Sequence, residues 1–466
     1  MGKASTVGEL KAQGYRARSV KEELRENLIR KIQEGSELFP GIVGYESSVI
    51  PLVENAILSG QDIILLGERG QAKTRLARSL VNLLDPEIPV VAGSEVNDDP
   101  LEPISAFARE LLDKHGDDTP IEWVPRDVRY GEKLATPDIT IADLIGEVDP
   151  IKVAEGRYLS DELTIHYGLL PRTNRGIFVL NELPDLAERI QVGLLNIMEE
   201  RDIQIRGYKV RLPLDLFVVA SANPEDYTNR GRIITPLKDR FGSQIRTHYP
   251  TSLSHEIDIM EQEQSRFPSD EFEITYPDFM KEIVAELTHV ARRSNDISQR
   301  SGVSVRVSIC NYENVRSNAL RRAIRLREKQ VAPRVSDLVA VSASTGGKIE
   351  LEGVGEVNEE KVLDRLIAKA VSNVFGRHFQ LSDLEQLTHS FENGLRIEVS
   401  DNMPVLEYVR QASEVAGMPQ AIAKLGAQGN PAAMASAMEL VLEGLYVNRK
   451  LNKERSAGPG RFRYRG

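Results

Sequence analysis

The chain has 466 residues, 28% charged and 41% hydrophobic, which is enough for about two to four domains with large cores. Its formal net charge of −11 argues against general nucleic-acid binding, and no apolar run is long enough to cross a membrane. The single cysteine, Cys310, excludes an internal disulfide and a cysteine-based metal site. The first residues lack the apolar core of a signal peptide, so we expect a cytoplasmic protein.

Residues 1–39 are predicted to form an N-terminal helical extension. Ser19 and Glu22 have the spacing of a capping box, and Leu24, Leu28 and Ile32 recur on one helical face. The segment that follows contains a short apolar turn made of Ile42, Val43, Gly44 and Tyr45.

The stretch Ile63–Leu76 reads as a buried strand, a glycine-containing loop and a helix that begins near Lys73. Glycines let backbone N–H groups approach phosphate oxygens, Lys73 adds a positive charge, and the Thr74 hydroxyl is suited to ligate Mg²⁺. Ala72 stands where the usual GxxxxGK[ST] pattern has its second glycine, and we expect a helical φ there, which alanine accepts. The stretch predicts a site for ATP and Mg²⁺ made of Gly67, Glu68, Arg69, Gly70, Gln71, Ala72, Lys73, Thr74 and Arg75. In P-loop motors, a turn such as Ile42–Tyr45 often lies under the adenine.

Two apolar runs, Gly176–Leu180 and Leu216–Ala220, read as fully buried strands, and Ile203–Leu214 alternates around Gly207 as a hairpin does. Strands that alternate with helices predict a parallel sheet covered on both faces, an α/β domain over residues 40–250. Pro89–Gly93 reads as a further strand. Insertions are predicted near 94–137, with a helix near Ile104–Lys114, and near 146–170, with a hairpin at Glu155–Tyr158.

Polar residues follow the two buried strands directly. Because the carboxyl ends of parallel strands share one edge, Asn181, Glu182 and Asn223 should meet Lys73 and Thr74 there. Glu182 has the position of a carboxylate that polarises an attacking water, and Asn223 that of an amide that holds the water or the γ-phosphate. Asn181 stands where an aspartate normally orders the waters of Mg²⁺, so it is a metal ligand without charge.

Two arginines are candidates for stabilising the transferred phosphoryl group. Arg240 lies in an exposed-looking segment, Leu237–Phe241, and could enter the site of a neighbouring subunit as an arginine finger; the alternative is an ion pair with Asp239 or a nearby acid. Arg306, in the helical region, could reach the same phosphate, with Arg316, Arg321 and Arg322 as nearby alternatives.

The remaining chain is predicted to be helical, with a lid domain over 251–395 and a C-terminal region over 396–457. The lid is indicated by a stripe of Phe279, Ile283, Leu287 and Val290. Residues 458–466 read as a flexible basic tail, with contact to RNA or an acidic partner as the alternative.

As a set, Lys73-Thr74, Asn181-Glu182, Asn223-Pro224, the Ile203–Leu214 hairpin and Leu237–Phe241 resemble the core of the AAA+ ATPases. The inserted hairpins and the run ANPEDYTNRGRIITPLKDRFG resemble most closely the magnesium chelatase ATPase subunit and its MoxR-type relatives. The resemblance covers about residues 40–330. It implies a homo-oligomeric, hexameric ring with ATP sites between subunits and the helical domain acting as a lid.

Two functions follow from these expectations. The first is an ATP-hydrolysing ring motor that remodels a partner protein or supports metal insertion, with magnesium chelation and MoxR-type chaperone work both open. The alternative is a nucleotide-gated assembly or scaffold protein with negligible hydrolysis, which Asn181 favours. The chain has no DxSxS signature, so a metal-adhesion (von Willebrand A-type) partner would be a separate protein, and no GAFTGA-like loop, which argues against a σ54 activator.

Overall fold

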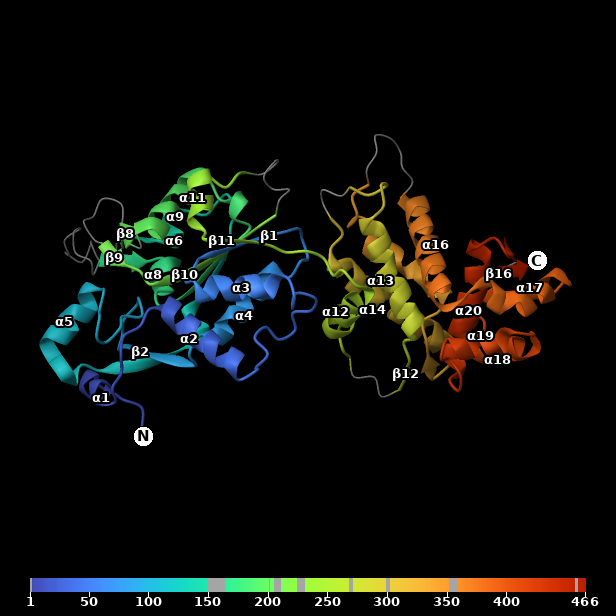
Figure 1. Cartoon of the computed structure of the whole chain (residues 1–466), viewed down its shortest axis with the longest axis horizontal. Helices are drawn as coiled ribbons and strands as arrows, with labels where there is room; N and C mark the ends of the chain where they lie inside the picture. The colour runs from blue at the N-terminus through green and yellow to red at the C-terminus, as the bar shows by residue number, and fades with distance from the viewer. Residues whose placement is uncertain are drawn as a thin grey trace. The chain divides into compact units, whose positions relative to one another are not determined.

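The computed structural model describes residues 2–148, 164–200, 202–204, 211–223, 231–267, 271–298, 302–351, 359–456 and 460–466. They divide into two compact units, Met1–His248 and Tyr249–Gly466. The first unit contains a five-stranded sheet in which all neighbouring strands are parallel (Figure 1). Across the sheet the strands are β11 (Ser243–Arg246), β1 (Ile63–Leu66), β10 (Leu216–Ala222), β7 (Gly176–Asn181) and β4 (Tyr130–Leu134). The predicted α/β fold class is confirmed.

Helices cover both faces of this sheet (Figure 1). Side chains alternate between faces along a strand, so Ile63 and Leu65 pack into one core and Ile64 into the other. One face carries α2 (Val20–Gln33), α3 (Val49–Leu58) and α4 (Lys73–Ser79). The other carries α6 (Ile141–Leu144), α8 (Leu169–Arg172), α9 (Glu188–Glu200) and α11 (Thr235–Arg240). Burial on both faces explains why β1, β7 and β10 read as continuous apolar runs.

The predicted insertion at 94–137 differs from the structure in one important respect. Its helix is present as α5 (Ala106–His115), but Tyr130–Leu134 is no insertion, because it forms the edge strand β4 beside β7. The predicted strand near Pro89–Gly93 is β2 (Glu87–Val91), which pairs antiparallel with β3 (Ile121–Pro125) outside the main sheet. The edge strand β4 was missed because an edge strand is half exposed, and its mixed polar composition gives no continuous apolar run in the sequence.

Two further antiparallel pairs lie where hairpins were predicted. In the second insertion, β5 (Gly146–Val148) pairs with β6 (Ile165–Tyr167). In the later segment, β8 (Asp202–Gln204) pairs with β9 (Arg211–Pro213). The predicted hairpin turns at Glu155–Tyr158 and Gly207 lie outside the described residues.

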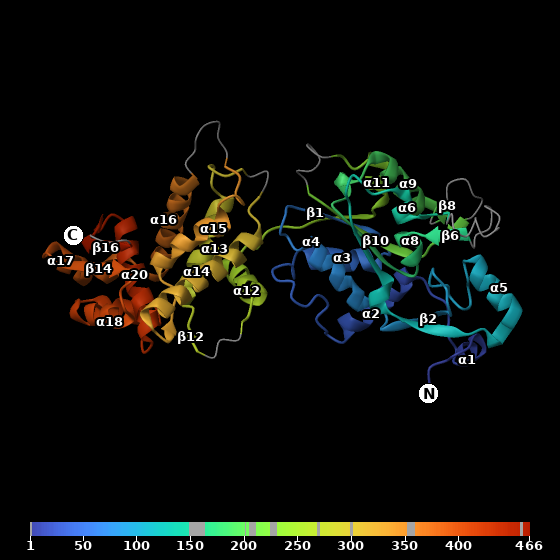
Figure 2. The same cartoon turned by 180° about the vertical axis from the view of Figure 1, so that it is seen from behind.

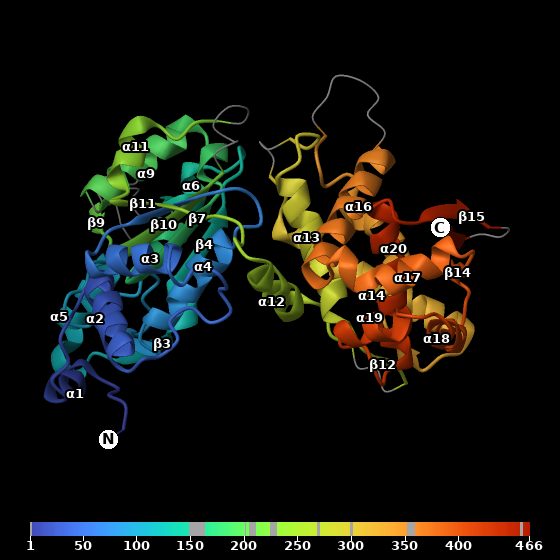
Figure 3. The same cartoon turned by 45° about the vertical axis from the view of Figure 1, so that its right-hand side comes forward.

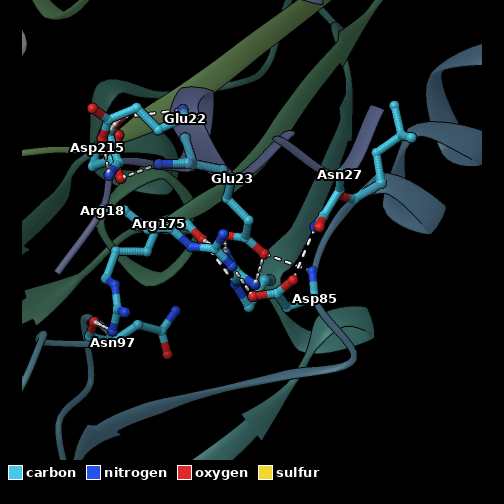
Figure 4. Close-up of polar contacts among 12 residues, drawn as sticks. Arg18, Glu22, Glu23, Asn27, Asp85, Asn97, Arg175 and Asp215 are labelled. Carbon is cyan, nitrogen blue, oxygen red and sulfur yellow. Dashed lines mark hydrogen bonds and ion pairs between the residues drawn. The ribbon is translucent and has the colours of Figure 1, made fainter. Parts of the chain in front are cut away.

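The N-terminal extension is tied to the amino edge of the sheet by buried polar contacts. Helix α1 (Val7–Ala12) lies beside α5 and β2 (Figure 2), and α2 begins at the predicted capping box of Ser19 and Glu22. The Glu23 carboxylate forms a fully buried ion pair with Arg129. Figure 4 shows Glu23 together with Asn27 and Asp85, and Asn27 Nδ2 donates to the Asp85 carboxylate at 2.9 Å.

The second unit has one helical core that spans both predicted regions, 251–395 and 396–457 (Figure 3). Its α-helices are α12 (Leu253–Glu263), α13 (Asp278–Arg292), α14 (Val305–Leu326), α15 (Ser342–Thr345), α16 (Glu359–His378), α17 (Glu385–Glu392), α18 (Val405–Glu414), α19 (Met418–Lys424) and α20 (Pro431–Val447). The stripe predicted from Phe279 to Val290 is buried on α13. A short parallel pair, β12 (Glu273–Ile274) with β13 (Gln330–Val331), lies at its periphery. Among the described residues, none of the helices combines the length and the apolar character that crossing a bilayer requires.

The predicted flexible tail at 458–466 is wrong for Arg461–Arg465. These residues form β16, which pairs antiparallel with β14 (Arg396–Ser400) on one side and β15 (Asn452–Arg455) on the other. The alternation of arginine and aromatic residues is the period-two pattern of a half-buried strand. Tyr464 is 3% exposed and its hydroxyl contacts the Glu443 carboxylate, while Arg463 pairs with Glu398.

Short 3₁₀ segments connect many of these elements. They are Leu80–Leu83, Gly116–Asp118, Arg126–Arg129, Leu183–Asp185, Val335–Val341 and Leu381–Leu384.

Candidate nucleotide site

The predicted phosphate loop runs from the end of β1 to the start of α4. Gly70 has a φ of +76°, which glycine adopts without strain. Ala72 has a φ of +54° and a ψ of 15°, the left-handed region, immediately before α4. The prediction that Ala72 has a helical φ is therefore wrong. The backbone at this position has the left-handed conformation that glycine adopts freely, so the alanine is strained here.

The loop is held from inside by the side chain of Gln71. Its Oε1 accepts hydrogen bonds from the backbone N–H of Glu68 at 3.0 Å and from the Thr247 hydroxyl at 2.8 Å. A Cβ at Gly67 would come within 1.9 Å of the Thr247 hydroxyl oxygen, so this position needs glycine for space. Gln71 was predicted as a nucleotide-binding residue, and the structure gives its side chain an anchoring role within the loop.

Lys73 lies at the mouth of the loop and is 7% exposed. Its Nζ donates to the carbonyls of Gly67 at 2.5 Å and Glu68 at 2.8 Å, and to Asn223 Oδ1 at 2.6 Å. These contacts orient the ammonium group beside the loop N–H groups, where phosphate oxygens would bind.

Asn223 connects Lys73 to Glu182. The Lys73 ammonium group can only donate hydrogen bonds, so Asn223 turns its Oδ1 toward Lys73. Its Nδ2 then donates to Glu182 Oε2 at 2.8 Å. Glu182 has a φ of +56° directly after β7, and its backbone N–H donates to Ser221 Oγ at 3.2 Å. The two predicted catalytic residues therefore meet at the carboxyl edge of the sheet as expected.

Asn181 meets Thr74 at the same edge. The Thr74 hydroxyl lies 3.5 Å from Asn181 Oδ1, and the Ser221 hydroxyl donates to that oxygen at 3.1 Å. Asn181 Nδ2 donates to Glu132 Oε1 at 2.8 Å. Hydroxyl and amide oxygens together with a nearby carboxylate suit Mg²⁺, which keeps several waters and binds mainly through substrate phosphates. Within the described residues, no group of three or more histidine, cysteine or acidic side chains could hold a metal alone.

The apolar turn at Ile42–Tyr45 contacts the loop from the other side. Ile42 and Tyr45 are buried, and the Tyr45 hydroxyl lies 2.8 Å from the carbonyl oxygens of Gln71 and His248. Burial raises the pKa of the Tyr45 hydroxyl to about 12, so it stays protonated and donates. The turn thus fixes the position of the loop, and its contact with adenine stays a prediction.

The two candidate arginines are exposed in this chain. Arg240 Nη2 pairs with Glu199 at 2.5 Å, and its Nη1 lies 3.9 Å from Asp239, so the ion-pair alternative describes its present contacts. Arg306 lies in the first turn of α14, in the second unit. A contact of either residue with phosphate stays a prediction, as does one of Arg69 and Arg75, which are exposed beside the loop.

Four residues of this site were missed or misplaced by sequence reasoning: Glu132, Ser221, Thr247 and His248. Ser221 could have been found, because it precedes Ala222-Asn223 at the end of a buried strand. Thr247 and His248 follow β11, the sheet's edge strand, for which no apolar run gave a signal. Glu132 was assigned to an insertion.

A separate cavity of 840 Å³ lies at the opposite, amino edge of the sheet, lined by Arg18, Asp99, Arg175 and Asp215 among others. Figure 4 shows Arg18, Arg175 and Asp215 in this region. Arg175 pairs with Asp99 at 2.9 Å, and Arg18 pairs with Asp85. Because Arg175 and Arg18 are both engaged in ion pairs, the loop at the carboxyl edge remains the candidate site.

The chain is similar to known proteins over more than half of its length. Residues 155–240 match the family model of the Sigma-54 interaction domain. The chain is 28% identical over 262 residues to the magnesium-chelatase subunit ChlI of a Nostoc species, which covers 55% of this chain. It is 26% identical over 287 residues to the chloroplastic subunit ChlI-1 of Arabidopsis thaliana, covering 59% of this chain. The matched regions span 64% of the length of each of these two relatives.

Two solved structures are similar at lower identity. A complex between subunits BchI and BchD of magnesium chelatase gives 19% identity and a TM-score of 0.37, covering 72% of this chain and 95% of that one. An ATPase of unassigned role from Cytophaga hutchinsonii gives 17% identity and a TM-score of 0.32, covering 78% and 98%.

Proposed function

Because the chain is an AAA+ protein related to the magnesium chelatase subunit ChlI, we propose that it binds ATP with Mg²⁺ at the β1–α4 loop and hydrolyses it. The observation that carries this proposal is the hydrogen-bonded series from Lys73 through Asn223 to Glu182. It joins a phosphate-binding cation to a carboxylate through a single amide side chain, and these are the two groups that ATP hydrolysis needs near the γ-phosphate.

Each residue of the series then has one role. Lys73 holds the β- and γ-phosphates, and Thr74 with Asn181 faces the metal, which would neutralise the charge that develops on the phosphates. Glu182 accepts a proton from the attacking water. Asn223 fixes the direction of the Glu182 carboxylate, because its own amide is oriented by Lys73.

We propose further that the chain works as a cytoplasmic homo-oligomeric ring, a hexamer, that remodels a partner protein or supports metal insertion. The relatives are named as subunits, which supports a function shared with other chains. A separate von Willebrand A-type protein is the partner that we expect. In a ring, Arg240 would leave Glu199 and enter the neighbouring site, and Arg306 would approach the phosphate from the helical unit. Exposure of both side chains allows this.

The test compares the ATP turnover of the Glu182→Gln variant with that of wild type. The matched control is Glu188→Gln, which changes an exposed side chain at the start of α9. Loss of a general base lowers turnover by about 10²–10⁴-fold, whereas ATP binding should persist because Lys73 and the loop are unchanged. The control should keep full turnover. Phosphate release by Glu182→Gln at the wild-type rate would refute the proposed role.

The second candidate is a nucleotide-gated assembly protein that binds ATP without significant hydrolysis. The uncharged Asn181 at the metal-facing position favours it, because the metal would be held less tightly. It predicts ATP-dependent oligomers by light scattering, with phosphate release at background. Sustained phosphate release that depends on Glu182 removes this candidate.

A further inference from the structure

The carboxylate that is missing at Asn181 has a counterpart on the neighbouring strand. Glu132 lies on β4, opposite Val179 of β7, and its side chain reaches along the sheet to Asn181. The Glu132 Oε1 atom accepts a hydrogen bond from Asn181 Nδ2 at 2.8 Å. A negative charge is therefore present next to the metal-facing amide, supplied by the adjacent strand.

Glu132 also decides which way the Asn181 amide faces. An ionised carboxylate only accepts hydrogen bonds, so the Asn181 NH₂ group must turn toward Glu132. The amide oxygen then faces the opposite way, toward the hydroxyls of Thr74 and Ser221. Without the carboxylate, nothing in these contacts would prevent the amide from turning its NH₂ group toward the metal position.

Contacts besides Asn181 hold the Glu132 carboxylate in place. The Tyr130 hydroxyl donates to its Oε2 at 3.0 Å. The Arg78 contacts are bidentate, from Nε at 2.7 Å and Nη2 at 2.9 Å. Arg78 thus fixes the carboxylate in position, and its Nη2 shares Glu132 Oε1 with the Asn181 amide.

We propose that Glu132 is a positioning residue for Mg²⁺–ATP, which orients the Asn181 amide oxygen toward the Thr74 hydroxyl and supplies the negative charge that Asn181 lacks. The proposal rests on the proposed nucleotide site. Mg²⁺ selects oxygen donors and is bound by one or two carboxylates together with phosphates and waters. Asn181 on β7 and Glu132 on β4 thus together supply the oxygen atom and the negative charge that a single aspartate would supply.

A purely structural role is the competing explanation, because Glu132 also holds Arg78 of α4. Four variants separate the two: Glu132→Gln, Arg78→Gln, Asn181→Asp, and Glu132→Gln combined with Asn181→Asp. Each full-length protein is titrated with a fluorescent ATP analogue, once with Mg²⁺ and once with EDTA. The readout is the ratio of the two dissociation constants, which does not depend on turnover.

Wild type should bind the analogue more tightly with Mg²⁺ than with EDTA. Glu132→Gln should lose about ten-fold of this advantage, since one nearby charge is removed and the amide is freed, while its affinity in EDTA stays unchanged. Arg78→Gln should keep the advantage. Asn181→Asp alone should gain nothing, because two carboxylates within hydrogen-bond distance repel, whereas the double variant should regain the wild-type ratio.

Three results would overturn the inference: a Mg²⁺ advantage that survives Glu132→Gln, an equal loss in Arg78→Gln, or a double variant that regains nothing. The affinity in EDTA shows whether each variant is folded. A variant that loses both this affinity and the Mg²⁺ advantage would therefore also count against a positioning role. No binding of the analogue to wild type under either condition would instead refute the proposed nucleotide site itself.

Discussion

The strain at Ala72 gives the most direct test of the loop geometry. Its backbone is left-handed, with a φ of +54°, and its side chain is exposed, so replacement by glycine removes no buried contact. The left-handed conformation costs an L-residue about 1–2 kcal/mol, and glycine avoids this cost. Glycine in turn loses about 0.5–1 kcal/mol more chain entropy on folding than alanine. Ala72→Gly should therefore stabilise the first unit by about 0.5–1 kcal/mol.

The chain contains a convenient local probe. Its single tryptophan, Trp123, lies half-buried on β3 of the first unit, so its fluorescence during urea denaturation reports that unit selectively. With a urea m-value of about 2–3 kcal/mol per M, the expected stabilisation raises the midpoint by about 0.2–0.5 M. No nucleotide is needed for this measurement.

Ala12, an exposed alanine of the right-handed helix α1, is the matched control. Ala12→Gly should lower the midpoint, because glycine is up to about 1 kcal/mol less favourable than alanine in a helix. Opposite signs for the two substitutions would support the left-handed assignment at Ala72. A midpoint that falls in Ala72→Gly as it does in Ala12→Gly would refute it.

Two further substitutions and one deletion test the site and the second unit. Thr247→Val removes the hydroxyl that donates to Gln71 Oε1, and should lower the free energy of unfolding reported by Trp123 by about 0.5–1.5 kcal/mol; Thr247→Ser should restore most of it. Glu256→Gln should destabilise the second unit by about 3–5 kcal/mol at pH 7, because it leaves the buried Arg292 guanidinium without its carboxylate partner. Burial raises the pKa of Glu256, but hydrogen bonds from His289, Arg292 and Ser308 lower it by a larger amount. The folded pKa therefore lies below the unfolded value of about 4.3. The stabilisation is present above that unfolded value and is lost as the pH falls through the folded pKa, so the difference between the two proteins should shrink below about pH 4 in denaturation curves. Deleting residues 460–466 removes the middle strand of a three-stranded sheet and should lower the melting temperature of the second unit, whereas Arg465→Ala, which breaks only an exposed ion pair with Glu454, should change it little.

The parts of the fold that were predictable share one physical property. Gly176–Asn181 and Leu216–Ala222 are buried on both faces, so their sequences are continuous apolar runs that identify central parallel strands without further information. The residues that follow such strands must lie at the carboxyl edge. The sequence could therefore indicate that Asn181, Glu182 and Asn223 lie beside Lys73 and Thr74. The hydrogen bonds confirm this, since Asn181 contacts Thr74 and Asn223 joins Lys73 to Glu182.

Edge strands could not be predicted in the same way. Tyr130–Leu134 pairs on one side only and carries Gly131, Glu132 and Lys133, so its composition is that of a loop. Its assignment depends on the pairing with β7, which is a long-range property. The backbone of Ala72 is a different case, because the usual motif has glycine there, and an alanine was interpreted as evidence for a helical φ. The structure keeps the conformation of the motif and places the strain on the alanine.

The same long-range pairing changes how the site should be understood. Lys73, Asn223 and Glu182 were predicted as separate contributors, but one amide joins them, since Asn223 accepts from Lys73 and donates to Glu182. Removing the lysine takes away one of the two contacts that orient the amide and leaves it held by the Glu182 carboxylate alone. The effects of substituting Lys73 and Glu182 should then be coupled and not additive, although the two side chains need not touch. In the proposed function, phosphate binding by Lys73 and water binding by Glu182 would thus depend on the orientation of a single side chain, and Asn223 would be the residue that connects binding to hydrolysis.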